Sequence, residues 1–126
     1  MKKKRALGDA AGLTKIGINY TLLMPGKESS MRHWHTLEDE LVYLLSGEVV
    51  LVTDAGEQTL RTGQYAGFPA GRSDGHHLVN RSQEPAVYLE ISNRDSEDSA
   101  QYPDVDLRWN APDARGKFSH KDGKPY

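Results

Sequence analysis

Cysteine is absent from this chain of 126 residues. Its absence excludes disulfide bonds, thiolate metal ligands and a cysteine nucleophile, so any metal ion would have to be held by nitrogen and oxygen atoms. Long hydrophobic runs are absent too, and no segment reaches the ~20 apolar residues that a membrane-spanning helix needs. We therefore expect neither a disulfide framework nor a membrane protein.

An excess of charge of one sign is also missing. The 16 basic and 18 acidic residues give a formal net charge of −2, which does not match the basic surface of a nucleic-acid-binding protein. The opening MKKKR is followed by ALGDAAGLTK, which is too polar for the hydrophobic stretch of a secretion signal. We expect a cytoplasmic protein with a small-molecule substrate or ligand, and with no nucleic-acid or membrane partner.

Short apolar runs fill the middle of the chain. They include IGINYTLLM, ELVYLLS, EVVLVT and AVYLEIS, and Gly, Pro, Asn and Asp separate them at short intervals. This pattern is typical of an all-β sandwich or barrel, and TDAGEQ has the composition of a hairpin turn. The length fits a single domain, so we predict one all-β barrel over residues 16–92.

The two ends of the chain differ from the middle. Residues 1–15 are basic and then rich in Gly and Ala, and we interpret them as an N-terminal arm. Residues 93–126 are polar, with isolated apolar residues that include Tyr102 and Trp109. A disordered tail is one interpretation. Because disordered segments seldom carry aromatic residues at this density, we favour a C-terminal arm packed on the barrel or on a partner subunit.

Two histidines, His33 and His35, lie one residue apart in the segment RHWHTLEDE. In a strand, residues i and i+2 point to the same face, so these two imidazoles could bind a single ion. Three acidic residues follow. Glu40 directly precedes the apolar run LVYLLS and would belong to that strand, whereas Glu38 and Asp39 would lie in a solvated turn.

A second pair of histidines, His76 and His77, ends a loop in GQYAGFPAGRSDGHHLVN. Strand alternation lets only one of them face the barrel interior. His76 shares a face with Leu78 and Asn80, and His77 has the opposite phase. The residues alone leave both histidines open as metal ligands.

The last run of the predicted barrel, AVYLEIS, offers two further candidates. We expect its aliphatic residues, Val87, Leu89 and Ile91, to face the core. If the strand instead turns its other face to the interior, Tyr88 and Glu90 would face inward, where they could donate a proton or contact a ligand histidine.

The segment around the first histidine pair resembles the first motif of the cupin family. That motif is Gly, a spacer, His-x-His, a short spacer, Glu, six residues and Gly. The matching residues are Gly26, His33, His35, Glu40 and Gly47. The spacer after Gly26 is one residue longer than the common form.

The second histidine pair resembles the second cupin motif, which is Gly, five residues, Pro-x-Gly, two residues, His, three residues and Asn. The matching residues are Gly63, Pro69, Gly71, His76 and Asn80. The loop before the histidine is longer by two residues. The spacing selects His76, with His77 as the alternative. The flanking segments resemble small single-domain bacterial cupins that are sometimes labelled sugar-phosphate isomerases.

The resemblance implies a double-stranded β-helix, the cupin jelly-roll barrel. It also implies one divalent metal ion per chain (Mn, Fe, Ni or Zn), held by His33, His35, Glu40 and His76. Four such ligands leave two positions of an octahedral ion open for water, substrate or oxygen, as a catalytic site requires. Because the histidines must be neutral to bind, metal affinity should fall in mild acid.

The same resemblance suggests a metal-dependent enzyme. Isomerase, epimerase or lyase chemistry on a small, oxygenated, sugar-like substrate is the leading hypothesis. An Fe(II)-dependent cupin dioxygenase and a non-catalytic ligand-binding or sensor protein are the alternatives. We also expect a homodimer, since cupin barrels commonly pair through sheet edges and arms.

Overall fold

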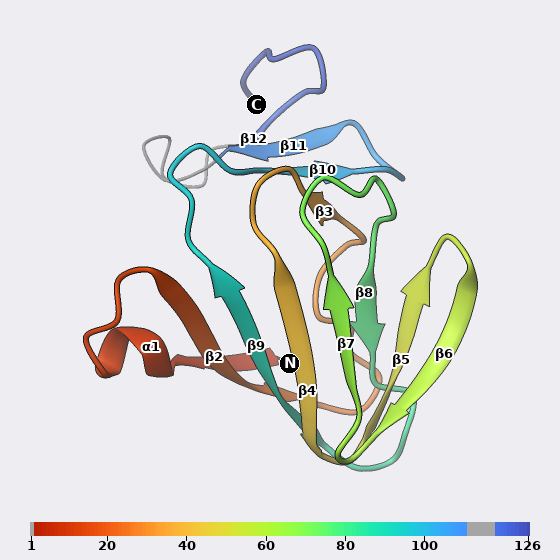
Figure 1. The fold of residues 1–126 in the computed structure, drawn as a ribbon. Helices are drawn as coiled ribbons and strands as arrows, with labels where there is room; N and C mark the ends of the chain where they lie inside the picture. The colour runs from red at the N-terminus through yellow and green to blue at the C-terminus, as the bar shows by residue number, and fades with distance from the viewer. Residues whose placement is uncertain (1, 111–117) are drawn as a thin grey trace.

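The computed structural model describes residues 2–110 and 118–126, and nearly all of its regular structure is β-strand (Figure 1). The all-β prediction is confirmed. Among the described residues the only helix is the short α1 (Leu7–Ala10), which joins β1 to β2. No described helix has the length and apolarity needed to cross a membrane.

Two sheets form the barrel. The larger sheet has the strand order β1-β2-β9-β4-β7, and the smaller has the order β6-β5-β8. The strands of the larger sheet are β1 (Lys2–Ala6), β2 (Ile16–Leu23), β9 (Ala86–Asn93), β4 (Glu40–Ser46) and β7 (Tyr65–Phe68). Those of the smaller are β6 (Gly56–Arg61), β5 (Glu48–Thr53) and β8 (His77–Val79). The TDAGEQ segment forms the β5–β6 hairpin, as predicted.

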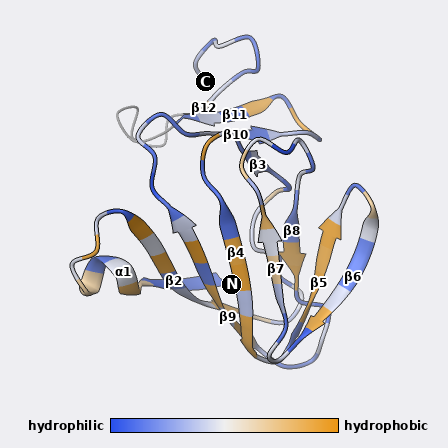
Figure 2. Cartoon of the chain, in the orientation of Figure 1, coloured by the Kyte–Doolittle hydropathy of each residue, from blue (hydrophilic) through white to orange (hydrophobic). Residues whose placement is uncertain are grey.

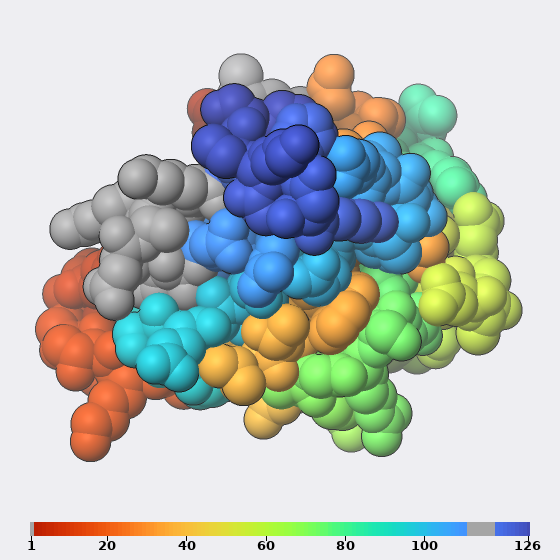
Figure 3. Space-filling model, turned by 90° about the horizontal axis from the view of Figure 1, so that it is seen from above, coloured from red at the N-terminus to blue at the C-terminus, as the bar shows by residue number. Residues whose placement is uncertain are grey.

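A third sheet lies across one end of the barrel, above it in Figure 1. Its order is β12-β11-β10-β3, with strands β12 (Phe118–Ser119), β11 (Leu107–Asn110), β10 (Ser99–Tyr102) and β3 (Trp34–His35). Seen from above in Figure 3, the blue C-terminal residues cover the middle of this end. The C-terminal segment therefore pairs with the strand that carries the first histidine motif. Residues 111–117 of the expected C-terminal arm, and residue 1 of the N-terminal arm, lie outside the described residues.

The hydrophobic core lies between the two barrel sheets. Val42 and Leu44 of β4 are buried against Val49 and Leu51 of β5, in one cluster with residues of β2, β6, β8 and β9. Burying one aliphatic side chain of this kind contributes ~1.5–3 kcal/mol. Figure 2 shows hydrophobic positions along the barrel strands and mostly hydrophilic residues around β3 and β10. The core thus fills one end of the barrel and leaves polar groups at the other.

The orientation of β9 differs from the first expectation. Its Tyr88 is fully buried in the core, and the aliphatic residues Val87, Leu89 and Ile91 alternate with it and are only half-buried. The expectation that these aliphatic residues face the core is wrong. The expectation fails because the outer face of the large sheet is also apolar: Leu41 pairs with Ile91, and Tyr43 pairs with Leu89. Hydrophobicity therefore does not distinguish the two faces of this strand.

The tight turn between β4 and β5 depends on Gly47. Its φ is 83°, a left-handed conformation that side chains with a Cβ disfavour. A Cβ at this position would also lie 2.8 Å from the carbonyl oxygen of Pro85, which precedes β9. Two separate constraints, backbone conformation and close approach, thus act on the same residue.

The substitution Gly47→Ala should destabilise the barrel more than Gly63→Ala. Gly63 has a φ of 85°, but nothing lies within 4 Å of its ideal Cβ. The left-handed backbone alone costs ~1–2 kcal/mol, and this part is common to both variants. Urea unfolding followed by tryptophan fluorescence measures the difference. Equal losses of unfolding free energy would show that the contact with Pro85 has no effect.

Candidate metal centre

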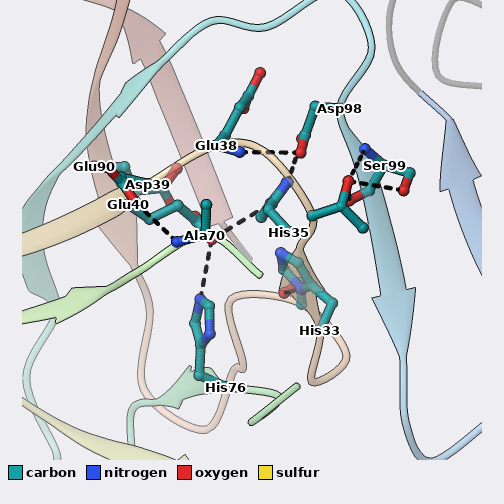
Figure 4. A network of polar contacts seen from close by, with 12 residues as sticks. His33, His35, Glu38, Asp39, Glu40, Ala70, His76, Glu90, Asp98 and Ser99 are labelled. Atoms are coloured by element: carbon teal, nitrogen blue, oxygen red, sulfur yellow. Dashed lines mark hydrogen bonds and ion pairs between the residues drawn. The ribbon is translucent and has the colours of Figure 1, made fainter. Parts of the chain in front are cut away.

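The residues of the two histidine motifs meet at the polar end of the barrel (Figure 4). A backbone bridge joins them: the amide of His33 donates to the carbonyl of His76 at 3.2 Å, and the amide of His76 donates to the carbonyl of His33 at 3.0 Å. His35 follows in β3, and Glu40 is the first residue of β4. Main-chain pairing therefore joins the two motifs, and the side chains of His35 and Glu40 meet the pair from β3 and β4.

The side chains of His33, His35 and Glu40 have the dimensions of a single coordination sphere, and Glu40 links them to His76. Oε1 of Glu40 lies 3.3 Å from Nε2 of His35 and 3.2 Å from Nε2 of His76. His33, His35 and Glu40 each offer a ligand atom within 4.8 Å of the others. Ligands on opposite sides of an octahedral ion, with bonds of about 2.1–2.3 Å, are about 4.2–4.6 Å apart. These three ligands are compact enough for one ion, and His76 lies against the carboxylate oxygen that they share.

Hydrogen bonds on the far side of two rings orient them. Nδ1 of His33 lies 2.9 Å from the carbonyl oxygen of Met31. Nδ1 of His35 lies 2.6 Å from Oδ2 of Asp98. A carbonyl and a carboxylate can only accept, so Nδ1 carries the hydrogen in both rings. The Nε2 lone pair of each histidine is then available to a metal ion.

Aromatic packing positions the third ring. His76 is 6% exposed, and its imidazole stacks on the ring of Phe68 with a centroid distance of 3.6 Å and an interplanar angle of 3°. Phe68 ends β7, the strand that pairs with β4. The plane of the His76 imidazole is therefore fixed by the same sheet that carries Glu40.

Asp98 is a site residue that the sequence did not indicate. It is 1% exposed, and its Oδ1 accepts hydrogen bonds from the backbone amides of Leu37 and Glu38 while Oδ2 binds His35. It lies between β9 and β10, outside both motifs and inside the expected C-terminal arm. The surrounding SEDS has the composition of an ordinary polar loop, and no signal in it could have identified this residue.

The pKa values follow from burial and from the mixture of charges. Burial lowers the pKa of the His33 imidazole. Burial acts in the same direction on His35, but Asp98 and Glu40 outweigh it and raise the pKa of that imidazole. For Glu40, burial raises the pKa, and the surrounding imidazoles outweigh it and leave the value below the usual range. An ionised Glu40 among imidazoles favours a cation at this point.

Two buried atoms of this cluster, Oε1 of Glu40 and Nδ1 of His76, lack a hydrogen-bond partner among the described residues. Oε1 of Glu40 is buried and has no hydrogen-bond partner among the described residues, because neither of its close imidazole contacts has hydrogen-bond geometry. An unpaired buried carboxylate oxygen is costly. A divalent cation between this oxygen and the Nε2 atoms would satisfy it. Three nitrogen donors and one carboxylate oxygen suit Mn, Fe, Ni or Zn, so the residues present fit such an ion.

The remaining candidates occupy different places. His77 turns away from the cluster, with Nδ1 2.7 Å from the carbonyl oxygen of Ser30 and 3.4 Å from a carboxylate oxygen of Glu28. Tyr88 is fully buried, and burial raises the pKa of its hydroxyl. Glu90 borders the cavity beside the cluster, with its side chain 24% exposed. Of the two residues of β9, the structure brings only Glu90 to the cavity.

Arg32 connects the third sheet to the barrel beside the cluster. Its Nε and Nη2 each lie 2.9 Å from a carboxylate oxygen of Asp104, and its Nη1 lies 2.8 Å both from Asp54 and from the carbonyl oxygen of Gly75. The side chain is only 14% exposed. Because Gly75 directly precedes His76, this arginine holds the loop that delivers the third imidazole.

The cluster forms part of the wall of a cavity of about 870 Å³. Most of the other lining residues are polar or charged, and they include Asn19, Ser29, Ser30, Ser92, Lys2 and Lys4. Trp109 of β11 also borders the cavity, so the third sheet supplies part of its wall. The site is open to a small molecule, unlike a closed structural metal site.

Comparison with known proteins agrees with this geometry. The family described as "Cupin domain" matches residues 19–92, which is more than half of the chain. The chain belongs to the cupin family, and the prediction of a jelly-roll barrel is confirmed. Comparison with curated proteins gives no match.

Three solved structures illustrate the range of similarity. A sugar phosphate isomerase of the cupin superfamily from Silicibacter pomeroyi is 40% identical, with a TM-score of 0.95 over 99% of this chain and 80% of that chain. A protein provisionally named sugar phosphate isomerase from Acidithiobacillus ferrooxidans is 30% identical, with a TM-score of 0.88 and the same two coverages. The polyketide cyclase RemF from Streptomyces resistomycificus is 22% identical, with a TM-score of 0.63 over 73% of this chain and 64% of that chain. This last likeness is one of fold alone.

Replacing His33 or His76 by alanine should remove most of the bound divalent metal, because each substitution deletes one nitrogen donor of the cluster. His77→Ala is the matched control, since its imidazole contacts Ser30 and Glu28 instead. Elemental analysis of the purified proteins after equilibration with Mn²⁺ or Ni²⁺ measures the metal per chain. Unchanged metal in the first two variants would refute the ligand assignment.

The substitution Asp98→Asn should weaken metal binding by about 10- to 100-fold, the usual cost of losing a carboxylate that orients a ligand histidine. Asp95→Asn, in the same loop, serves as control because Asp95 bonds to the amide of Glu97 and to no histidine. Competition with a chelating dye gives the dissociation constants. Equal constants for the Asp98 variant and the wild type would leave the His35 contact without influence on the metal.

Proposed function

We propose that this cupin is a metal-dependent isomerase or epimerase, or a lyase, acting on a small, oxygenated, sugar-like substrate. The observation that carries this proposal is the position of the cluster, which faces a large cavity lined mostly by polar and charged residues and is not enclosed by protein. The names of the two structures that are 40% and 30% identical, both sugar phosphate isomerases, support it.

A divalent ion held by His33, His35, Glu40 and His76 would supply Lewis acidity, polarising a carbonyl or enediolate oxygen of the substrate. Asp98 keeps the His35 ring in the orientation that this binding requires. The hydroxyl and amide groups of the cavity wall suit the many oxygens of a sugar-like compound.

Glu90 is the group that we assign to proton transfer. It lies opposite Val42 on the inner face of the large sheet and borders the cavity, and Nζ of Lys4 holds its carboxylate at 3.2 Å. In an isomerisation this carboxylate takes a proton from the hydroxyl-bearing carbon beside the substrate carbonyl and returns it to the former carbonyl carbon, while the proton of that hydroxyl passes to the former carbonyl oxygen. Tyr88 does not take this part, because its side chain is fully buried in the core.

The metal-loaded protein should exchange substrate C–H hydrogen for deuterium when it is incubated in D₂O with a panel of aldose and ketose phosphates. Proton NMR measures both this exchange and the interconversion. A chelator should abolish both. Glu90→Gln should slow the exchange by about 100-fold or more, the typical contribution of a general base, while the bound metal is retained.

Glu57→Gln, which changes an exposed carboxylate of β6 that pairs with Arg81, is the control. Oxygen uptake by the Fe(II)-loaded protein, without isomerisation, would replace the proposal with the dioxygenase alternative. Saturable binding of a panel member without turnover would favour the sensor alternative. The homodimer and the cytoplasmic location remain predictions.

A further inference from the structure

Strand β1 places two lysines on the inner face of the large sheet. In the β1–β2 pairing, Lys2 lies opposite Leu23 and Lys4 opposite Thr21. Leu23 and Thr21 are fully buried and face the barrel interior. Directly opposed residues of antiparallel strands point to the same face, so both lysines face inward. Lys3, between them, faces outward.

Both inward lysines line the cavity to which the metal cluster opens. Nζ of Lys2 donates to the carbonyl oxygen of Ser29 at 2.6 Å, and no described carboxylate lies within ion-pair distance of it. Nζ of Lys4 lies 3.2 Å from Glu90. Two ammonium groups therefore share one carboxylate, and this wall of the cavity carries excess positive charge.

The other charged residues of the cavity lining are Arg94, Glu38, Asp95 and the implied ligand Glu40, so the excess is local to the wall formed by β1 and does not extend to the whole cavity. Arg94 lines the cavity, and its charge is paired with the carboxylate of Asp9, which does not line it. The carboxylate of Glu38 accepts a hydrogen bond from the amide of Asp95 in the loop after β9. Burial and the nearby Lys4 lower the pKa of Lys2, and Glu90 raises it by less. A bound anion would stabilise the charged form of the lysine against both effects.

We propose that Lys2 and Lys4 form a subsite for the anionic group of the substrate, a phosphate monoester or a carboxylate. The inference rests on the proposed function in that the same molecule would reach the metal cluster with its oxygens. Two ammonium groups give charge-assisted hydrogen bonds to such an anion. The side chain of Ser29 borders the same cavity; its Oγ accepts from the amide of Leu78, and its hydroxyl hydrogen adds a neutral donor.

A competing explanation needs no ligand. The strand β1 is an edge strand of its sheet, and inward-pointing charges on edge strands discourage pairing with other chains. Under that explanation the lysines would affect aggregation and leave anion binding unchanged. The two explanations therefore differ in a binding measurement.

The experiment is a calorimetric titration of the full chain with inorganic phosphate, at constant ionic strength in chloride, after the metal has been removed with a chelator and the chelator dialysed away. A carboxy-terminal affinity tag keeps extra charge away from β1. We expect saturable binding that weakens by roughly tenfold or more in Lys2→Gln and Lys4→Gln, the loss expected for one charge-assisted hydrogen bond. Lys3→Gln, on the outer face of the same strand, should bind like the wild type. Lys2→Arg, which keeps the charge, should retain most of the affinity.

Absence of saturable binding, or equal weakening in Lys3→Gln, would overturn the proposal. A parallel titration with acetate distinguishes the two anions, since tighter phosphate binding points to a phosphate ester and tighter acetate binding to a carboxylate. Because the metal is removed before the titration, the result does not depend on the metal centre. Phosphate binding without isomerase activity would refute the proposed function alone, and metal-dependent turnover without phosphate binding would refute the subsite alone.

Discussion

The backbone bridge between His33 and His76 is the contact on which the site depends. It is made of two main-chain hydrogen bonds, so it fixes the distance between the two histidine motifs without using either imidazole. The loop before His76 is longer than the common cupin form, and Arg32 ties its last residue, Gly75, to the hairpin and to the third sheet. The imidazoles are left with Nε2 for the cavity and with Nδ1, in His33 and His35, for orientation.

Much of this arrangement follows from local rules that a sequence displays. Strand alternation places His33 and His35 on one face, and the apolar run after Glu40 identifies the acid that belongs to a strand. Turn residues at short intervals predict the all-β fold. These rules work because each depends on a few neighbouring residues, and the cupin motifs record the same spacings. The preference for His76 over His77 also came from spacing, and the structure places His76 beside Glu40.

The features that the sequence did not predict depend on contacts between segments that are distant in the chain. The phase of β9 could not be predicted, because both faces of the large sheet are apolar and Val87, Leu89 and Ile91 fit either one. The inward lysines could not be predicted either, since their direction follows from the pairing of β1 with β2. Within MKKKR, Lys2 and Lys4 look the same as Lys3. Asp98 reaches His35 through the chain reversal after β9, which no local spacing encodes.

The position of Asp98 in the chain also bears on how cupins diverge. The family match ends at residue 92, and all four implied ligands lie before that point. The carboxylate that orients His35 lies after it, in the segment that forms the third sheet. Two cupins can therefore share an identical set of metal ligands and still differ in how firmly those ligands are held. Segments added to a common barrel can alter the reactivity of an inherited site without any change in the residues that define the family.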